Sequence, residues 1–145
     1  MSRPSTTFVY ACSALCIALG VHSYVRPRDE FARFGIPVPP ESSTPKQKPT
    51  PPSTTTTALE KGEGEYPLMH VKGIRDLTYG IALGAMQYQG LEPAVTIMVG
   101  VLSLAGLGDG FVVWMYGGER FKGKLWGHWG AFVVWGSWAL WRALS

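Results

Sequence analysis

The chain has 145 residues, of which 46% are hydrophobic and only 16% charged, whereas about 25% are charged in a typical soluble domain. Its net charge of +3 is small and is not gathered on an amphipathic helix, which argues against a nucleic-acid-binding protein. Its two cysteines, Cys12 and Cys16, lie one helical turn apart in an apolar segment, where a disulfide would be strained. We therefore expect one integral membrane domain, residues 1–145, with the lipid bilayer as its partner and no nucleic acid.

The first apolar segment covers residues 8–25 without a charge and ends at Arg26. Its length is near the lower limit for a helix that crosses about 30 Å of hydrocarbon. A cleaved signal peptide is the alternative, because Arg3 precedes the segment and residues 21–23 form a poor cleavage site. We interpret the segment as a retained helix.

Three further apolar segments follow, at residues 71–88, 93–116 and 125–144. Segment 71–88 is the least apolar, and segment 93–116 is the most apolar, with Asp109 as its only charge. Tryptophan and tyrosine residues cluster at the segment ends, as is typical of the bilayer interface. The pattern predicts an all-α fold, a four-helix transmembrane bundle with helices at about 8–25, 71–88, 93–116 and 125–144.

Small residues at four-residue spacing indicate where these helices pack closely. Ala14 and Ala18, with Gly20 after them, form such a set in the first segment, and Gly80 and Gly84 form a pair in the second. We expect both sets to face a neighbouring helix.

A proline- and threonine-rich stretch, at about residues 38–66, separates the first two segments. It lacks the apolar residues that would offset the entropy of ordering it, so we predict a long disordered loop. A proline-rich docking segment is the alternative interpretation.

Basic residues indicate the orientation of the bundle. Of the 13 lysines and arginines, all but Arg3 and Arg142 lie in or beside the two connections that share one side of the membrane. Cytoplasmic loops carry such an excess. We therefore expect cytoplasmic loops, lumenal or extracellular termini, and a location in the endoplasmic reticulum or another endomembrane.

The rare ionisable residues of these segments fall at one level near the loop side. At 1.5 Å per residue, Arg75 and Asp76 lie about 6–8 Å inside their segment, Asp109 about 10 Å before its exit, and His128 about 6 Å inside. His22 reaches a similar level. A carboxylate at such depth needs a partner, and Arg75 can hold Asp109 by two hydrogen bonds. His128 can exchange a proton near neutral pH.

Arg75, Asp76, Asp109 and His128 are therefore the candidate catalytic residues. Structural explanations stand beside this hypothesis: Arg75 could extend toward the interface, His128 could be one more interfacial ring, and an Arg75–Asp109 clamp could only hold helices together. The sequence has no metal-binding or phosphate-binding motif, so we expect no metal and no cofactor.

Five short motifs occur in order along the chain: FARFGIP at 31–37, VKGIRDL at 71–77, GLGDG at 106–110, YGG at 116–118 and GHW at 127–129. Together they resemble a family of small four-helix integral membrane proteins of fungi and bacteria that is known only as a domain of unknown function. Residues 41–65 resemble an insertion between the first two motifs. Because fungal members are often encoded beside polyketide or terpenoid biosynthesis genes, the resemblance implies a lipophilic small-molecule partner.

Two functions are compatible with these observations. The first is an accessory protein that holds biosynthetic enzymes or a hydrophobic intermediate at an endomembrane during synthesis of a lipophilic secondary metabolite. The alternative is a membrane-embedded acid–base enzyme, an isomerase, cyclase or hydratase, in which Asp76 or His128 transfers the proton and Arg75 stabilises negative charge. A transporter is a weaker third interpretation, because four helices would have to oligomerise to form a pathway.

Overall fold

The computed structural model describes residues 3–39 and 66–145, so most of the predicted disordered loop lies outside the described residues. The described part of the chain is all-α, as predicted, with no strand. It contains five helices: α1 (Arg3–Val25), α2 (Pro27–Phe34), α3 (Pro67–Tyr88), α4 (Glu92–Tyr116) and α5 (Gly118–Leu144). The prediction of four helices was wrong in number, because α2 was not expected.

Helix α2 is short, but its ends are well defined by local chemistry. Pro27 occupies the first turn, where the missing N–H costs nothing. Asp29 and Glu30 lie in the same turn, where acidic side chains are favoured by the helix dipole. Gly35 ends the helix in the left-handed region, at φ 105°, and its N–H donates to the Phe31 carbonyl at 3.0 Å.

The four long helices extend further than the apolar segments predicted. Helix α5 begins at Gly118 rather than near 125, and α3 begins at Pro67 rather than near 71. Two stretches, Thr6–Val25 in α1 and Glu92–Tyr116 in α4, are long and apolar enough to cross a membrane by length and composition. Large apolar side chains are also exposed on the outside of every long helix, among them Leu15, Ile81, Ile97, Leu104, Val133 and Leu140.

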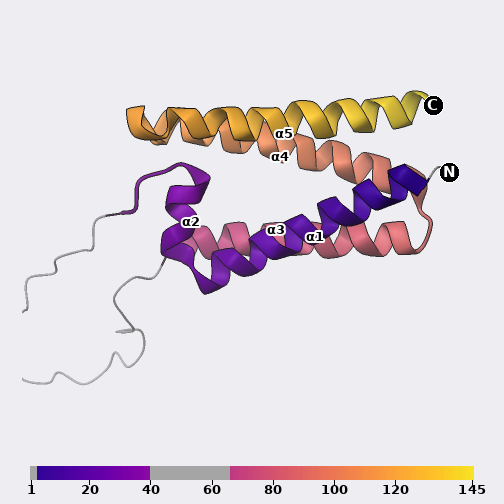
Figure 1. Ribbon diagram of the computed structural model, residues 1–145. Helices are drawn as coiled ribbons and strands as arrows, with labels where there is room; N and C mark the ends of the chain where they lie inside the picture. The colour runs from indigo at the N-terminus through magenta and orange to yellow at the C-terminus, as the bar shows by residue number, and fades with distance from the viewer. Residues whose placement is uncertain (1–2, 40–65) are drawn as a thin grey trace, which may run out of the picture.

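The long helices form two antiparallel pairs, α1 with α3 and α4 with α5 (Figure 1). Both termini lie at one end of the bundle, and α2 lies at the opposite end, between the two pairs (Figure 1). Near the termini, the pairs meet through α1 and α5, where the rings of Phe8 and Trp138 are 4.8 Å apart.

Glycines bring α1 and α3 into backbone contact. A Cβ on Gly80 would lie 2.8 Å from the backbone nitrogen of Ile17, and the Ser13 hydroxyl donates to the Gly80 carbonyl at 2.7 Å. The expected packing of the Gly80 and Gly84 face is therefore confirmed. In the first segment the expectation is confirmed for Gly20, where a Cβ would lie 2.7 Å from the backbone nitrogen of Leu77, and was wrong for Ala14 and Ala18, which are both exposed.

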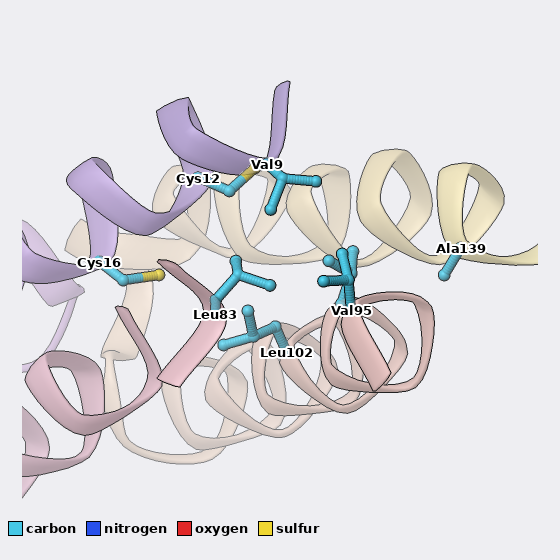
Figure 2. Packing of buried hydrophobic residues seen from close by; sticks show 8 residues of the cluster. Val9, Cys12, Cys16, Leu83, Val95, Leu102 and Ala139 are labelled. Atoms are coloured by element: carbon cyan, nitrogen blue, oxygen red, sulfur yellow. The ribbon is translucent and has the colours of Figure 1, made fainter. Parts of the chain in front are cut away.

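Two apolar clusters fill the interior. The first lies toward the termini and takes residues from all four long helices, as Figure 2 shows for Val9, Cys12, Cys16, Leu83, Val95, Leu102 and Ala139. The second lies under α2 and comprises Phe31, Phe34, Ile36, Tyr66, Met69, Val113 and Leu125. Because its members come from α2 and from both helix pairs, α2 packs between the two pairs and joins them at this end.

Candidate functional site

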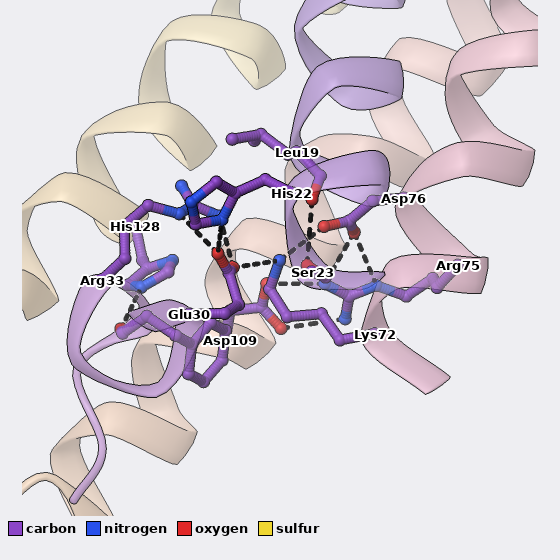
Figure 3. Close-up of polar contacts among 11 residues, drawn as sticks. Leu19, His22, Ser23, Glu30, Arg33, Lys72, Arg75, Asp76, Asp109 and His128 are labelled. Atoms are coloured by element: carbon purple, nitrogen blue, oxygen red, sulfur yellow. Dashed lines mark hydrogen bonds and ion pairs between the residues drawn. The ribbon is translucent and has the colours of Figure 1, made fainter. Parts of the chain in front are cut away.

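The Glu30 carboxylate is the centre of an ion network at the α2 end of the bundle. Its side chain has no exposed surface, and it contacts nitrogen atoms of basic side chains from three helices (Figure 3). His22 Nδ1 lies 2.9 Å from Oε2, Arg33 Nε donates to Oε2 at 2.6 Å, and Lys72 Nζ lies 3.0 Å from Oε1. The carboxylate thus ties α2 to α1 and α3.

Lys72 continues the network along α3. Its ammonium group, on a side chain that is only 9% exposed, donates to Asp76 Oδ2 at 2.5 Å. The other oxygen of Asp76 accepts from Arg75, at 3.2 Å from Nε and 3.1 Å from the terminal nitrogen. Asp76 therefore lies between two cations, which neutralise the negative charge of its carboxylate.

Arg75 extends the network from α3 to α4. Its two terminal nitrogens donate to the two carboxylate oxygens of Asp109, each at 2.9 Å. This two-point geometry is the strongest and most directional arrangement for an arginine–carboxylate pair. The structure thus pairs Asp109 with the residue that the sequence indicated, and the pair connects one helix pair to the other.

His128 lies at the same end but binds a different partner. Its Nε2 is 2.9 Å from the backbone carbonyl of Phe34, and the two rings meet edge to face at 5.0 Å. Because a carbonyl oxygen only accepts, Nε2 carries the hydrogen, and in the neutral ring Nδ1 holds the lone pair. Of the four candidate residues, the structure brings Arg75, Asp76 and Asp109 together, while His128 anchors α2 to α5.

The charges of the network balance. Three carboxylates, on Glu30, Asp76 and Asp109, face three permanent cations, on Arg33, Lys72 and Arg75. Burial raises the pKa of the Glu30 carboxyl, but hydrogen bonds and positive charge from Arg33 and Lys72 outweigh this effect and hold its pKa below the ordinary value. Glu30 is therefore ionised at neutral pH.

Sequence reasoning missed Glu30, Arg33 and Lys72. The signal that could have found them is Glu30 itself, an acidic residue within a basic stretch beside an uncharged helix, with Arg33 one turn later. His22 was placed at the correct level, and it belongs to the network through Glu30.

A smaller polar cluster lies at the other end of the bundle. Glu92 at the start of α4 forms an ion pair with Arg142 near the end of α5, and Gln87 Nε2 donates to Glu92 at 3.3 Å. The Arg142 guanidinium also lies over the ring of Trp138, 4.9 Å from its centroid. This cluster links three helices where the chain turns from α3 to α4.

Neither cluster is built to hold a metal ion. Within residues 3–39 and 66–145, no group of three or more His, Cys, Asp or Glu side chains is placed to bind one. The carboxylates at the α2 end instead face lysine and arginine, whose positive charge repels a metal cation.

Comparison with known proteins decides the family. The family model of DUF4267, a domain of unknown function, matches residues 13–142. The chain belongs to the DUF4267 family. No curated protein and no solved structure matches it. The match begins within α1 and ends within α5, so the ion network lies entirely within the DUF4267 domain.

Proposed function

We propose that this DUF4267 protein is a multi-pass protein of the endoplasmic reticulum or another endomembrane. Its four long helices cross the bilayer, the α2 end faces the cytoplasm, and both termini are lumenal or extracellular. The apolar surface on the outside of every long helix supports this placement, because a water-soluble bundle would turn those side chains inward. The excess of basic residues at the α2 end supports the orientation.

Within that membrane, we propose an accessory role in the biosynthesis of a lipophilic secondary metabolite of the polyketide or terpenoid type. The observation that carries the non-catalytic assignment is the closure of the ion network. Every carboxylate in it is hydrogen-bonded to at least one cation, and Arg75 is held by both Asp76 and Asp109. Such a network fixes the relative positions of helices, which a scaffold for enzymes or for a hydrophobic intermediate requires. The metabolite class itself comes only from the resemblance to a family whose fungal members are often encoded beside such biosynthetic genes.

The experiment is a metabolite profile of the native host with and without the chain, using an extract of hydrophobic compounds. We expect one lipophilic product, or its late precursors, to fall in the deletion strain and to recover when the chain is restored. An unchanged profile in every growth condition that expresses the chain would refute the metabolic role.

The alternative is a membrane-embedded acid–base enzyme, and His128 is the observation that favours it. Its Nδ1 holds a lone pair in the neutral ring, and the Arg75 side chain is 32% exposed, so a ligand can reach it. In this case His128 would accept or return the proton, and Arg75 would stabilise the developing negative charge, oriented by Asp109.

A charge exchange separates the two functions. The double variant Arg75→Asp/Asp109→Arg reverses the clamp and preserves its charge balance, so an accessory protein should recover much of the product that either single variant loses. An enzyme should not recover, because its active-site cation has moved to another helix. The pair Asp109→Asn and His128→Ala, compared at equal protein level, provides the second readout, since unchanged output excludes the enzyme.

The segment 41–65 provides a further distinction. It lies outside the described residues, and its proposed role is a cytoplasmic tether for partner enzymes. Its deletion should reduce metabolite output if the chain acts as a scaffold and spare it if the chain acts as an enzyme.

A further inference from the structure

A groove of about 470 Å³ opens at the α2 end of the bundle, apart from the ion network. Its walls come from α2, from the segment after α2, and from the junction of α4 and α5. The apolar wall is formed by Ala32, Pro37, Val38 and Phe121. The groove is therefore bounded by segments that are distant in sequence and joined by the fold.

Two cations that form no ion pair within the described residues lie at this end of α5, Arg120 in the groove wall and Lys124 outside it. Arg120 lines it, with its guanidinium 5.5 Å from the centroid of the Phe121 ring. Lys124 does not line the groove but lies one turn further along α5, where its Cβ is 2.9 Å from the Cβ position of Gly35, and the Gly35 carbonyl in turn lies 2.6 Å from the Cβ position of Gly117 in the groove wall. Both side chains are exposed, and in the part of the chain that the structure describes neither forms an ion pair.

The surrounding charges do not cancel these two. Glu119 lines the groove as well, but it is paired with Lys122. Arg33 is held by Glu30 in the ion network. With Glu119 paired to Lys122, Arg120 in the groove wall and Lys124 one turn away leave an excess of positive charge at this end of α5, next to the apolar wall.

We propose that this groove binds one anionic phospholipid of the surrounding leaflet. The headgroup phosphate would lie between Arg120 and Lys124, and an acyl chain would follow the apolar wall. An unpaired cation pair beside apolar side chains at the end of a helical bundle matches a ligand with an anionic head and a hydrocarbon tail. The inference rests on the proposed membrane placement and is independent of the metabolic role.

The test measures phospholipid retention by the full chain purified in a mild detergent. The chain receives equal amounts of phosphatidylserine and phosphatidylcholine, and native mass spectrometry counts the lipids that remain bound. We expect selective retention of phosphatidylserine. Because one cation near an anionic lipid contributes about a fivefold factor in binding, Arg120→Gln and Lys124→Gln should each lower retention by about that factor.

Two further variants distinguish binding in the groove from attraction of the lipid to the overall positive charge of this end. Ala32→Phe fills the groove without changing charge and should lower phosphatidylserine retention. Arg26→Gln removes an exposed cation of the same end that does not line the groove, and it should leave retention unchanged. Circular dichroism confirms that each variant remains helical.

Several outcomes would overturn the inference. Equal retention of both lipids by a chain that partitions into membranes would do so, as would an Arg26→Gln loss equal to that of Arg120→Gln, since binding would then follow diffuse charge. Displacement by inorganic phosphate would assign the site to the free anion. If deletion of residues 41–65 raised phosphatidylserine retention several-fold, the groove would be assigned to that segment instead. A chain that stays in the aqueous phase would instead refute the membrane placement.

Discussion

Replacement of Glu30 by glutamine tests whether the buried carboxylate holds the α2 end together. Glutamine keeps the shape of the side chain but removes the charge that His22, Arg33 and Lys72 contact. Removing one partner of a buried ion pair costs about 3–5 kcal/mol, because the other charge is left uncompensated. The lower limit applies here, since Lys72 keeps Asp76 and the Arg33 side chain is 39% exposed and can be hydrated.

A loss of about 3 kcal/mol lowers the melting temperature of a chain of this size by about 6–12 °C. Scanning fluorimetry or circular dichroism in detergent measures this directly. The matched control is Glu119→Gln, which removes an ion pair between side chains that are 87% and 55% exposed. Such a pair contributes less than about 1 kcal/mol. If Glu30→Gln lowers the melting temperature no more than Glu119→Gln does, the assigned role of Glu30 is wrong.

Three other predictions follow from the same structure. Burial raises the pKa of Glu30 less than Arg33 and Lys72 lower it, so its ionisation stabilises the fold above pH 4.5. That contribution is lost as the pH falls below 4.5, so the difference in melting temperature between the wild type and Glu30→Gln should shrink as a pH titration proceeds into more acidic solution. Gly80→Ala should destabilise by about 1–3 kcal/mol, because its Cβ meets the backbone of α1. Gly127→Ala, where nothing lies within 4 Å, should be neutral or slightly stabilising in the same melting assay. The buried thiols of Cys12 and Cys16, 5% and 6% exposed, should react with a maleimide only when the chain is unfolded, and rapid labelling of the native chain would contradict the α1 packing.

The sequence was informative where a rare residue had few possible partners. Asp109 is the one charge in the most apolar segment, so the cost of burying it required a cation at the same depth, and Arg75 met that requirement. Gly80 and Gly84 were equally informative, because a residue without a Cβ marks the face on which a neighbouring backbone can approach.

The sequence was less informative where stability comes from tertiary contacts. Helix α2 has only eight residues, half of them charged, and its local helix signals, Pro27 in the first turn and Gly35 at the end, were interpreted as part of the charged connection that follows the first apolar segment. Its order depends on Glu30 and on the carbonyl that accepts from His128, neither of which is visible without the fold. Because α2 was missed, the partner of His128 was missed as well. Ala14 and Ala18 misled the assignment because alanine is compatible with both a packed and an exposed face.

The division of the clamp between α3 and α4 has a consequence for synthesis of the chain. A ribosome releases Arg75 before Asp109, so for a time α3 carries charges whose partner does not yet exist. The glycines of α3 permit an early association with α1, but Arg75 gains its α4 partner only when α4 emerges. We expect a chain truncated after residue 90 to insert α3 less completely than the full chain, as a glycosylation-site assay on nascent chains would show. Full insertion of α3 would then depend on α4, and we expect biogenesis that is cooperative across helices rather than sequential.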